Sequence, residues 1–502
     1  MTDRATTTVA GAPDAPDAPD APDAAGDLTA EQLGTVHLIG IGGVGMSGLA
    51  RLLLTRGIRV TGSELSQWPV LAGLRALGGT IYMSHQESNL DGVETVVYST
   101  AIPDDHVELV EARRRGLRVL HRSEALAAAM VGRRGIVVAG THGKTTTTSM
   151  VTLILQRAGL DPSFVIGGEI SEAASNAHHG SGEYFVVEAD EHDRSFLNYR
   201  PYAGVLTNID SDHLNNYGDL AGLAAAFEEF GLTVQPDGFL VACADDPGAR
   251  RVAELLRSRG RTVYTYGEAA DADLRLTDVT TSAAGVSYRA WLDGVELGRL
   301  GLPVPSAVLA LNSAAAALVL LRQGIGLDAV AGALASFAGM RRRFELKGTA
   351  AGVRVYDEYA YHPTSMTTAL HTLRALAGDG RLLVVFQPYR LYRTRQLGAE
   401  LAAALSLADE AVVLEVFGPG EMREPGEGGA ALTAAIDLPE SRKVFLPSAD
   451  AVPGEVRARA RPGDLVVTMG APPTSLLADE MLAVLAEAAP GGPGAGGPGG
   501  PA

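Results

Sequence analysis

Residues 135–148 read GIVVAGTHGKTTTT: an apolar strand-like run, a glycine-containing loop and a polar stretch that we expect to open a helix. In such a loop, successive backbone N–H groups surround a phosphate, Lys144 places a compact charge between the terminal phosphates, and Thr145 offers a hydroxyl to Mg²⁺. The 41 basic residues include only three lysines, Lys144, Lys347 and Lys443. Because an ammonium reaches between phosphates where a planar guanidinium does not, the loop predicts a nucleotide-phosphate site rather than a turn with a chance lysine.

Two more polar segments close apolar runs farther along the chain: EADEHD at 188–193 and TNIDSDH at 207–213. Carboxylates crowded into so short a segment repel one another unless a cation is near, and hard oxygen ligands beside Thr145 indicate Mg²⁺. We expect Glu188, at the strand end, to be a ligand, and His213 to be a second metal ligand or a substrate contact. The alternative is a solvated acidic loop.

A glycine-rich segment, GIGGVG at 40–45, follows the strand-like run at 35–39 and opens a helical stretch, and Glu64 ends the next strand. This arrangement suits a diphosphate over a helix N-terminus. It is typical of nicotinamide and flavin enzymes, but the roughly 100 residues before the next phosphate loop are few for a full dinucleotide fold. UDP therefore remains as good a ligand as NAD, and a tight turn without a ligand is the third possibility.

The length of 502 residues predicts about three domains, and strand-like runs alternate with helical stretches as in parallel α/β folds. A composition of 46% hydrophobic and 20% charged residues is ordinary for soluble globular chains. The predicted segments are an acidic, proline-rich tail (1–30), an N-terminal α/β domain (31–131), a central α/β domain (132–339), a C-terminal α/β domain (340–489) and a Gly/Pro tail (490–502).

Charge and patterning exclude several classes of protein. The net charge of -18 disfavours nucleic-acid binding, and no apolar run is long enough to span a membrane. We see no secretory signal, and the one cysteine, Cys243, cannot form an internal disulfide. We therefore expect a cytoplasmic protein, as a monomer or homodimer, with neither nucleic acid nor membrane as its partner.

Seven motifs together resemble those of the Mur ligases, the ATP-dependent amide ligases of peptidoglycan assembly, in order and approximate spacing over residues 34–475. The glycine segment and YSTAI are similar to those of the alanine-adding branch and its tripeptide-recycling relative. The motifs are GIGGVGMSG (40–48), YSTAI (98–102), HRSE (121–124), GTHGKTTTT (140–148), EADEHDRSF (188–196), TNIDSDH (207–213) and RRFELKG (342–348).

The resemblance implies a three-domain α/β enzyme: a Rossmann-like UDP-binding domain, a central P-loop ATPase-type domain and a C-terminal Rossmann-like domain. It implies that ATP activates the carboxylate of UDP-N-acetylmuramate as an acyl phosphate, which L-alanine then attacks. It makes Lys144, Glu188 and His213 catalytic, with Thr145, Glu188 and His213 holding Mg²⁺. The implied ATP site is Gly140, Thr141, His142, Gly143, Lys144, Thr145, Thr146, Asn312 and Arg342. The implied UDP-substrate site is Gly40, Gly42, Gly43, Gly45, Met46, Ser47, Glu64, Ser99, Thr100 and Ala101.

The chain departs from the family pattern mainly in the C-terminal domain. DEYAYHPTS at 357–365 has Tyr361 where the family has histidine, and FQPYRLYRTR at 386–395 has Tyr389 in a second histidine position. The amino-acid site is expected at Tyr361, His362, Arg390 and Arg393. Two hypotheses follow: an alanine-adding enzyme with a drifted C-terminal domain, or a paralogue that joins a different amino acid, peptide or carboxylate.

Two other classes of protein explain less of the sequence. A nicotinamide dehydrogenase would leave Lys144, Glu188 and His213 without a role. A non-catalytic, nucleotide-gated scaffold would leave the acidic segment at 188–193 unexplained.

Overall fold

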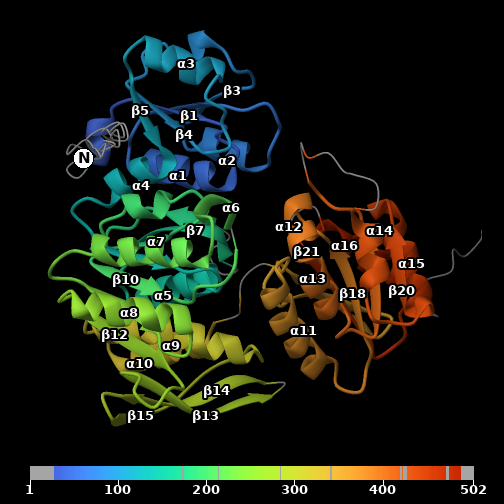
Figure 1. Ribbon diagram of the computed structural model, residues 1–502. Helices are drawn as coiled ribbons and strands as arrows, with labels where there is room; N and C mark the ends of the chain where they lie inside the picture. The colour runs from blue at the N-terminus through green and yellow to red at the C-terminus, as the bar shows by residue number, and fades with distance from the viewer. Residues whose placement is uncertain are drawn as a thin grey trace, which may run out of the picture.

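A computed structural model shows three α/β units along the chain, each built on its own sheet (Figure 1). It describes residues 28–170, 175–212, 214–282, 284–337, 339, 342–418, 421, 427–470 and 474–487. The predicted fold class, a three-domain α/β architecture, is confirmed. Nearly all of both predicted tails lies outside the described residues, and the exact domain boundaries stay predictions.

The N-terminal unit is a five-stranded parallel sheet in the order β3-β2-β1-β4-β5. The strand order reverses between β1 and β4, the place where open parallel sheets bind ligands, and the glycine segment follows β1 there. The strands are β1 (Val36–Ile39), β2 (Val60–Ser63), β3 (Thr80–Tyr82), β4 (Thr95–Tyr98) and β5 (Arg118–His121). The helices are η1 (Ala30–Leu33), α1 (Val44–Thr55), α2 (Val70–Ala76), η2 (Glu87–Leu90), α3 (Val107–Arg114) and α4 (Arg122–Met130).

The middle unit is a ten-stranded mixed sheet in which β6 lies between β10 and β9. All three strands are parallel, so the loop after β6 and the polar ends of β9 and β10 meet at one edge. The strands are β6 (Arg134–Ala139), β7 (Ser163–Ile170), β8 (Ser175–His178), β9 (Tyr184–Glu188), β10 (Ala203–Leu206), β11 (Phe239–Cys243), β12 (Val263–Gly267), β13 (Leu274–Ser282), β14 (Gly285–Leu292) and β15 (Val295–Leu302). The helices are α5 (Lys144–Arg157), η3 (Ser195–Asn198), α6 (Leu214–Tyr217), α7 (Leu220–Thr233), α8 (Pro247–Ser258), α9 (Ala307–Leu321) and α10 (Leu327–Ala335).

The C-terminal unit is a six-stranded sheet in the order β16-β17-β21-β18-β19-β20, parallel except for β16. Its strands are β16 (Glu345–Ala350), β17 (Val353–Glu358), β18 (Leu382–Gln387), β19 (Glu410–Leu414), β20 (Lys443–Leu446) and β21 (Leu465–Gly470). Its helices are α11 (Pro363–Ala377), α12 (Leu391–Gln396), α13 (Gly398–Leu405), α14 (Gly429–Ala435), η4 (Glu440–Arg442), η5 (Ala449–Ala451), α15 (Val452–Arg459) and α16 (Leu476–Glu487).

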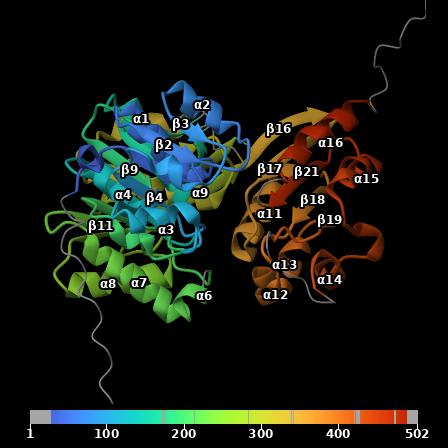
Figure 2. The ribbon, with the colours of Figure 1, turned by 90° about the horizontal axis from the view of Figure 1, so that it is seen from above.

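The N-terminal and middle units share one continuous apolar core, in which α1 packs on β7 and β8. The C-terminal unit has separate apolar clusters, among them one on each face of its sheet, and lies beside the other two (Figures 1 and 2). Side-chain hydrogen bonds connect the C-terminal unit to the middle unit, as described below. No helix in the described part of the chain is long and apolar enough to cross a membrane.

The part of the shared core that lies in the middle unit allows a direct test of packing. Phe230→Ala removes a fully buried ring on α7 that stacks on Phe196 with centroids 5.6 Å apart. We expect the free energy of unfolding to fall by about 3–5 kcal/mol, seen as a lower denaturant midpoint. Leu232→Ala, on the same helix but 40% exposed, should cost less than about 1 kcal/mol. Equal losses in the two variants would contradict this core assignment.

Candidate active site

The phosphate loop between β6 and α5 requires glycine at two positions. Gly140 has φ +127°, and a Cβ there would lie 2.1 Å from Thr207 Oγ1. Gly143 has φ +80°, and a Cβ there would lie 2.6 Å from Asn312 Oδ1. The loop therefore fits closely against β10 and α9, and it leads into the N-terminus of α5, where helix N–H groups are unpaired by the helix itself.

Asn208, just beyond β10, holds this loop in shape. Its Oδ1 accepts a hydrogen bond from the backbone N–H of His142 at 2.8 Å, and its Nδ2 donates to the His142 carbonyl at 3.0 Å. The Thr207 hydroxyl also donates to that carbonyl, at 2.6 Å. The polar segment after β10 thus positions the loop backbone.

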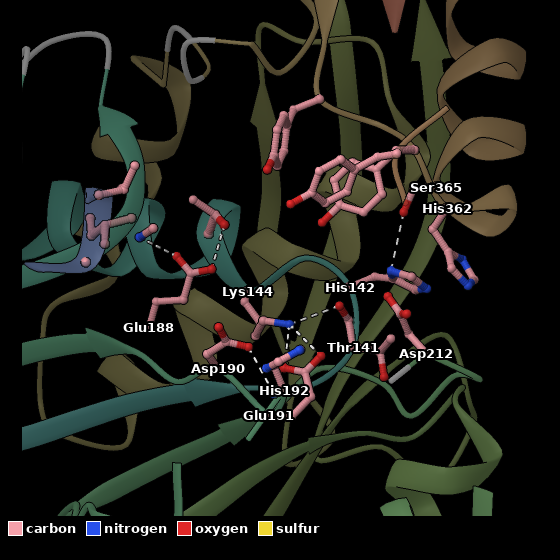
Figure 3. Close-up of a pocket in the computed structure, with 18 of the residues that line it drawn as sticks. Thr141, His142, Lys144, Glu188, Asp190, Glu191, His192, Asp212, His362 and Ser365 are labelled. Carbon is pink, nitrogen blue, oxygen red and sulfur yellow. Dashed lines mark hydrogen bonds and ion pairs between the residues drawn. The ribbon is translucent and has the colours of Figure 1, made fainter. Parts of the chain in front are cut away.

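Lys144 is the first residue of α5; its side chain is 14% exposed, and its ammonium has three acceptors (Figure 3). Nζ donates to the carbonyls of Gly140 (2.6 Å) and Thr141 (3.0 Å) and lies 2.8 Å from Glu191 Oε2. Burial alone would lower the lysine pKa, but Glu191 and Asp190 raise it, so Lys144 remains charged. Burial also raises the pKa of Glu191 to about 7.

Glu188 ends β9 and faces the start of α5. Its Oε1 accepts from the Thr145 hydroxyl at 2.7 Å and its Oε2 from the Gly167 backbone N–H at 2.7 Å. The two predicted metal ligands are therefore in direct contact. The third, His213, lies outside the described residues.

A cavity of about 570 Å³ opens between the three units, and it is called the first cavity below. The residues of the predicted UDP-substrate site that line it are Gly43, Gly45, Met46 and Ser99. The middle unit contributes Lys144, Thr145 and Glu188, and all four predicted amino-acid site residues, Tyr361, His362, Arg390 and Arg393, complete the wall. Residues predicted from the sequence in all three units thus face one space.

The other residues of the predicted UDP-substrate site shape the glycine segment or lie outside this wall. Glu64 Oε2 accepts from the Gly42 N–H at 3.1 Å, and the Ser47 hydroxyl donates to a backbone carbonyl of its own helix, 3.1 Å away. Gly40 has φ +70°, so it forms the turn after β1. Thr100 and Ala101 are exposed after β4.

A second cavity of about 390 Å³ lies on the other side of the phosphate loop. The residues of the predicted ATP site that line it are His142, Gly143, Thr146 and Asn312. Arg342 instead lies 3.1 Å from Asp357 Oδ2 and donates to the Gly470 carbonyl at 2.9 Å. Arg343 lines both cavities, and nothing in the sequence distinguishes these adjacent arginines.

Arg393 is a buried cation at the first cavity, with 4% of its side chain exposed. Its Nη2 lies 3.1 Å from Asp212 Oδ1, and its guanidinium lies over the Tyr361 ring, 4.8 Å from the centroid. Nε and Nη1 have no hydrogen-bond partner among the residues that the structure describes. Free guanidinium donors beside a cavity suit a carboxylate ligand.

The C-terminal unit contacts the phosphate loop through the start of α11. Thr364 Oγ1 donates to Asp210 Oδ2 at 2.7 Å, and Ser365 Oγ lies 3.3 Å from His142 Nδ1. Asp210 Oδ2 also lies 2.9 Å from His142 Nε2, and the hydrogen bonds from His142 and Thr364 lower the pKa of Asp210 despite partial burial. His362 Nε2 lies 3.3 Å from the Ser211 carbonyl.

Comparisons with known proteins assign all three units to one family. Family models for the Mur ligase family catalytic domain, the Mur ligase middle domain and the Mur ligase glutamate ligase domain match residues 35–134, 138–320 and 342–472. The chain belongs to the Mur ligase family.

Relatives of this Mur ligase match it over nearly its whole length. A UDP-N-acetylmuramate–L-alanine ligase from Salinispora arenicola is 68% identical over 92% of this chain and 90% of its own. One from Acidothermus cellulolyticus is 52% identical over 88% of this chain and 93% of its own. The crystal structure of UDP-N-acetylmuramate-alanine ligase MurC from Thermotoga maritima superposes with a TM-score of 0.75 at 26% identity, covering 89% and 98% of the two chains.

Family membership settles the class of protein. The resemblance drawn from the motifs is confirmed, and the chain is an ATP-dependent ligase. The dehydrogenase and scaffold hypotheses are thereby excluded. The role of Glu191 as the carboxylate that pairs with Lys144 was not predicted, since the sequence does not say which of the four acidic side chains at 188–193 turns inward.

Gly143 gives a sharp test of the phosphate loop in this Mur ligase. Gly143→Ala would force a methyl group to 2.6 Å from Asn312 Oδ1, displacing the loop. We expect ATP binding, measured by calorimetry, to weaken about tenfold or more, since small misplacements are costly at such sites. Gly159→Ala is the matched control: its φ of +75° gives a similar backbone strain, but nothing lies within 4 Å. If Gly143→Ala binds ATP as tightly as Gly159→Ala does, the close fit described here is wrong.

Proposed function

We propose that this Mur ligase joins L-alanine to the carboxylate of UDP-N-acetylmuramate in peptidoglycan precursor synthesis, at the expense of ATP. One observation carries the proposal: the glycine segment after β1, Lys144 and Arg393 come from three units and line one cavity. The L-alanine ligases similar to this chain cover its C-terminal unit as well, which favours alanine over a different amino acid. We expect the enzyme to act in the cytoplasm as a monomer or homodimer.

The first chemical step brings two anions together, the substrate carboxylate and the γ-phosphate of ATP. At 4 Å their repulsion is about 4 kcal/mol at an effective dielectric of 20. Lys144, with its charge held by buried acceptors, lies where it can offset this repulsion. In the proposed step the Lys144 ammonium exchanges its contact with Glu191 for one with the γ-phosphate. The substrate carboxylate oxygen attacks the γ-phosphorus, the bond to ADP breaks, and an acyl phosphate and free ADP result.

The residues beside the loop fit a magnesium ion. The carboxylate of Glu188 and the hydroxyl of Thr145, 2.7 Å apart, are the hard oxygen donors that Mg²⁺ prefers. We propose that both hold the ion together with His213. Bound there, Mg²⁺ would neutralise phosphate charge, while the backbone N–H groups of the loop orient the phosphates.

The second step needs L-alanine beside the acyl phosphate. We place its carboxylate on the unpaired Nε and Nη1 of Arg393, with Tyr361, His362 and Arg390 around it. Burial raises the pKa of Tyr361, and burial and the neighbouring His142 lower that of His362, so both are neutral near pH 7. The amine attacks the acyl carbonyl, an amide forms, and phosphate leaves.

Phosphate release tests the reaction as a whole. With ATP, Mg²⁺ and UDP-N-acetylmuramate, titrated against a panel of amino acids, L-alanine should give the highest kcat/KM. Release with another amino acid but not with L-alanine would support the paralogue hypothesis instead.

Lys144→Ala should reduce turnover about 10³-fold or more while leaving the fold intact, because it removes the charge that offsets two anions. The matched control is Lys347→Ala, which removes a partly exposed lysine that pairs with Glu345 and Asp479 in the C-terminal unit. Lys347→Ala should turn over normally. Normal turnover in Lys144→Ala would refute the mechanism.

Arg393→Lys should raise the KM for L-alanine about 10–100-fold, because a lysine cannot present the planar pair of donors. The KM for ATP should change little. Arg395→Lys serves as control, since Arg395 lies on the same helix but pairs with Glu427 at the surface. An unchanged KM for L-alanine in Arg393→Lys would place the amino acid elsewhere.

A further inference from the structure

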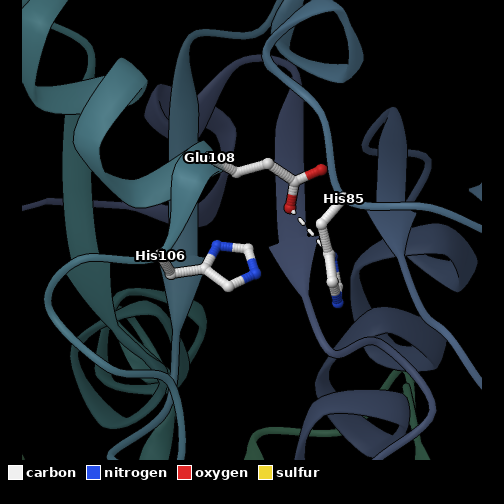
Figure 4. A group of neighbouring side chains, drawn as sticks. All are labelled: His85, His106 and Glu108. Atoms are coloured by element: carbon white, nitrogen blue, oxygen red, sulfur yellow. Dashed lines mark ion pairs between the residues drawn. The ribbon is translucent and has the colours of Figure 1, made fainter.

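A cluster of two histidines and a glutamate lies in the N-terminal unit and has no part in the proposed ligase reaction. His85 follows β3, His106 immediately precedes α3, and Glu108 belongs to the first turn of α3. Figure 4 shows the two imidazole rings and the Glu108 carboxylate directed toward one another. One ligand atom from each residue lies within 4.8 Å of those from the other two.

Glu108 is held as a carboxylate by a shell of polar partners. Its side chain is fully buried, Oε1 accepts from Asn89 Nδ2 at 2.7 Å, and Oε2 accepts from the Ser63 hydroxyl at 2.6 Å. His37 Nε2 lies 3.5 Å from Oε2 as well. A carboxylate oriented by outer-shell partners is typical of metal sites.

The contacts within the protein leave His106 unsatisfied. Both of its ring nitrogens are buried, and neither has a hydrogen-bond partner among the described residues. An imidazole always carries at least one N–H, and burying such a group unpaired costs about 1–3 kcal/mol.

The ring of His106 is directed at the other two groups. Its centroid lies 4.5 Å from that of His85, edge to face, and His85 Nδ1 lies 3.4 Å from Glu108 Oε2. A network of His85, Ser63 and Glu108 alone would account for two of the three residues but gives His106 no role. A cation between the three would satisfy it.

We propose that His85, His106 and Glu108 bind a divalent transition metal ion, Zn²⁺, with water in the fourth position. Two imidazoles and one carboxylate form a ligand set that zinc uses in proteins. Ligand atoms of a tetrahedral zinc site lie about 3.3 Å apart. His85 Nδ1 and Glu108 Oε2 are already 3.4 Å apart, and the other pairs, within 4.8 Å, would have to move closer. The ion would link the segment after β3 to the start of α3. It would lie near Ser63, which contacts His85 and immediately precedes Glu64, the residue that accepts a hydrogen bond from the Gly42 N–H.

Zinc binding to the full-length, tag-free protein tests this site without reference to turnover. The protein is stripped of metal by dialysis against a chelator, titrated with Zn²⁺ against a chromophoric competitor, and analysed for bound zinc. His106→Asn should bind one zinc equivalent fewer than the wild type, and zinc should raise the wild-type Tm by more than it raises that of the variant. The matched control, His371→Asn, removes an exposed histidine on α11 and should bind as the wild type does.

The number of zinc ions bound per molecule, compared between the wild type and each variant, separates this site from a second group with metal-binding geometry. That group is His142, Asp210 and His362 at the phosphate loop. If circular dichroism shows that His106→Asn is not folded, His85→Asn repeats the test, and it should also bind one zinc ion fewer than the wild type. Co²⁺ bound to the wild type should show tetrahedral absorption bands that both variants lose. Equal zinc stoichiometry and affinity in the wild type and the folded variants, or no binding by the wild type, would overturn the proposal.

Discussion

The ammonium of Lys144, whose side chain is mostly removed from water, is the constraint on which the rest of the site depends. Removing a charge from water costs several kcal/mol unless partners replace the solvent, and here two loop carbonyls and Glu191 do so. These partners are in place only if the loop folds back over the start of α5 and the segment after β9, which carries Glu191, lies beside Lys144. The strand order β10-β6-β9 provides both, because it places the loop between the two polar strand ends.

No single unit contains a complete site. The N-terminal and middle units share one core, so the glycine segment and Lys144 hold a fixed relation. The C-terminal unit has its own cores and meets the phosphate loop through polar groups such as Thr364 on Asp210 and Arg393 on Asp212. Polar inter-domain contacts of this kind exchange readily with water, so relative motion of the units is expected at this joint. The residues predicted for the amino-acid site lie on the C-terminal side of that joint.

The sequence predicted the parts of the site that follow from parallel strands. Polar segments that end neighbouring parallel strands must meet, so the proximity of Thr145 and Glu188 could be inferred from the motifs. Side-chain direction could not: which acidic residue pairs with Lys144, and whether Arg342 or Arg343 faces the cavities, depends on local backbone geometry. Both Arg342 and Phe344 have positive φ, a local twist that no propensity rule indicates at these residues.

The departures from the family pattern acquire a physical meaning once their positions are known. Both α11 and β18 lie between Tyr361 and Tyr389 in the chain, yet the two ring centroids are 5.4 Å apart, edge to face. Two imidazoles in those places would add groups that titrate near neutral pH, whereas burial raises the Tyr361 pKa and keeps that phenol neutral. Arg393 lies over both rings, 4.8 Å and 6.0 Å from their centroids, so the aromatic pair supports the guanidinium by cation–π contact. At these two positions the chain therefore places an aromatic pair that packs against the fixed positive charge of Arg393 in the wall of the first cavity.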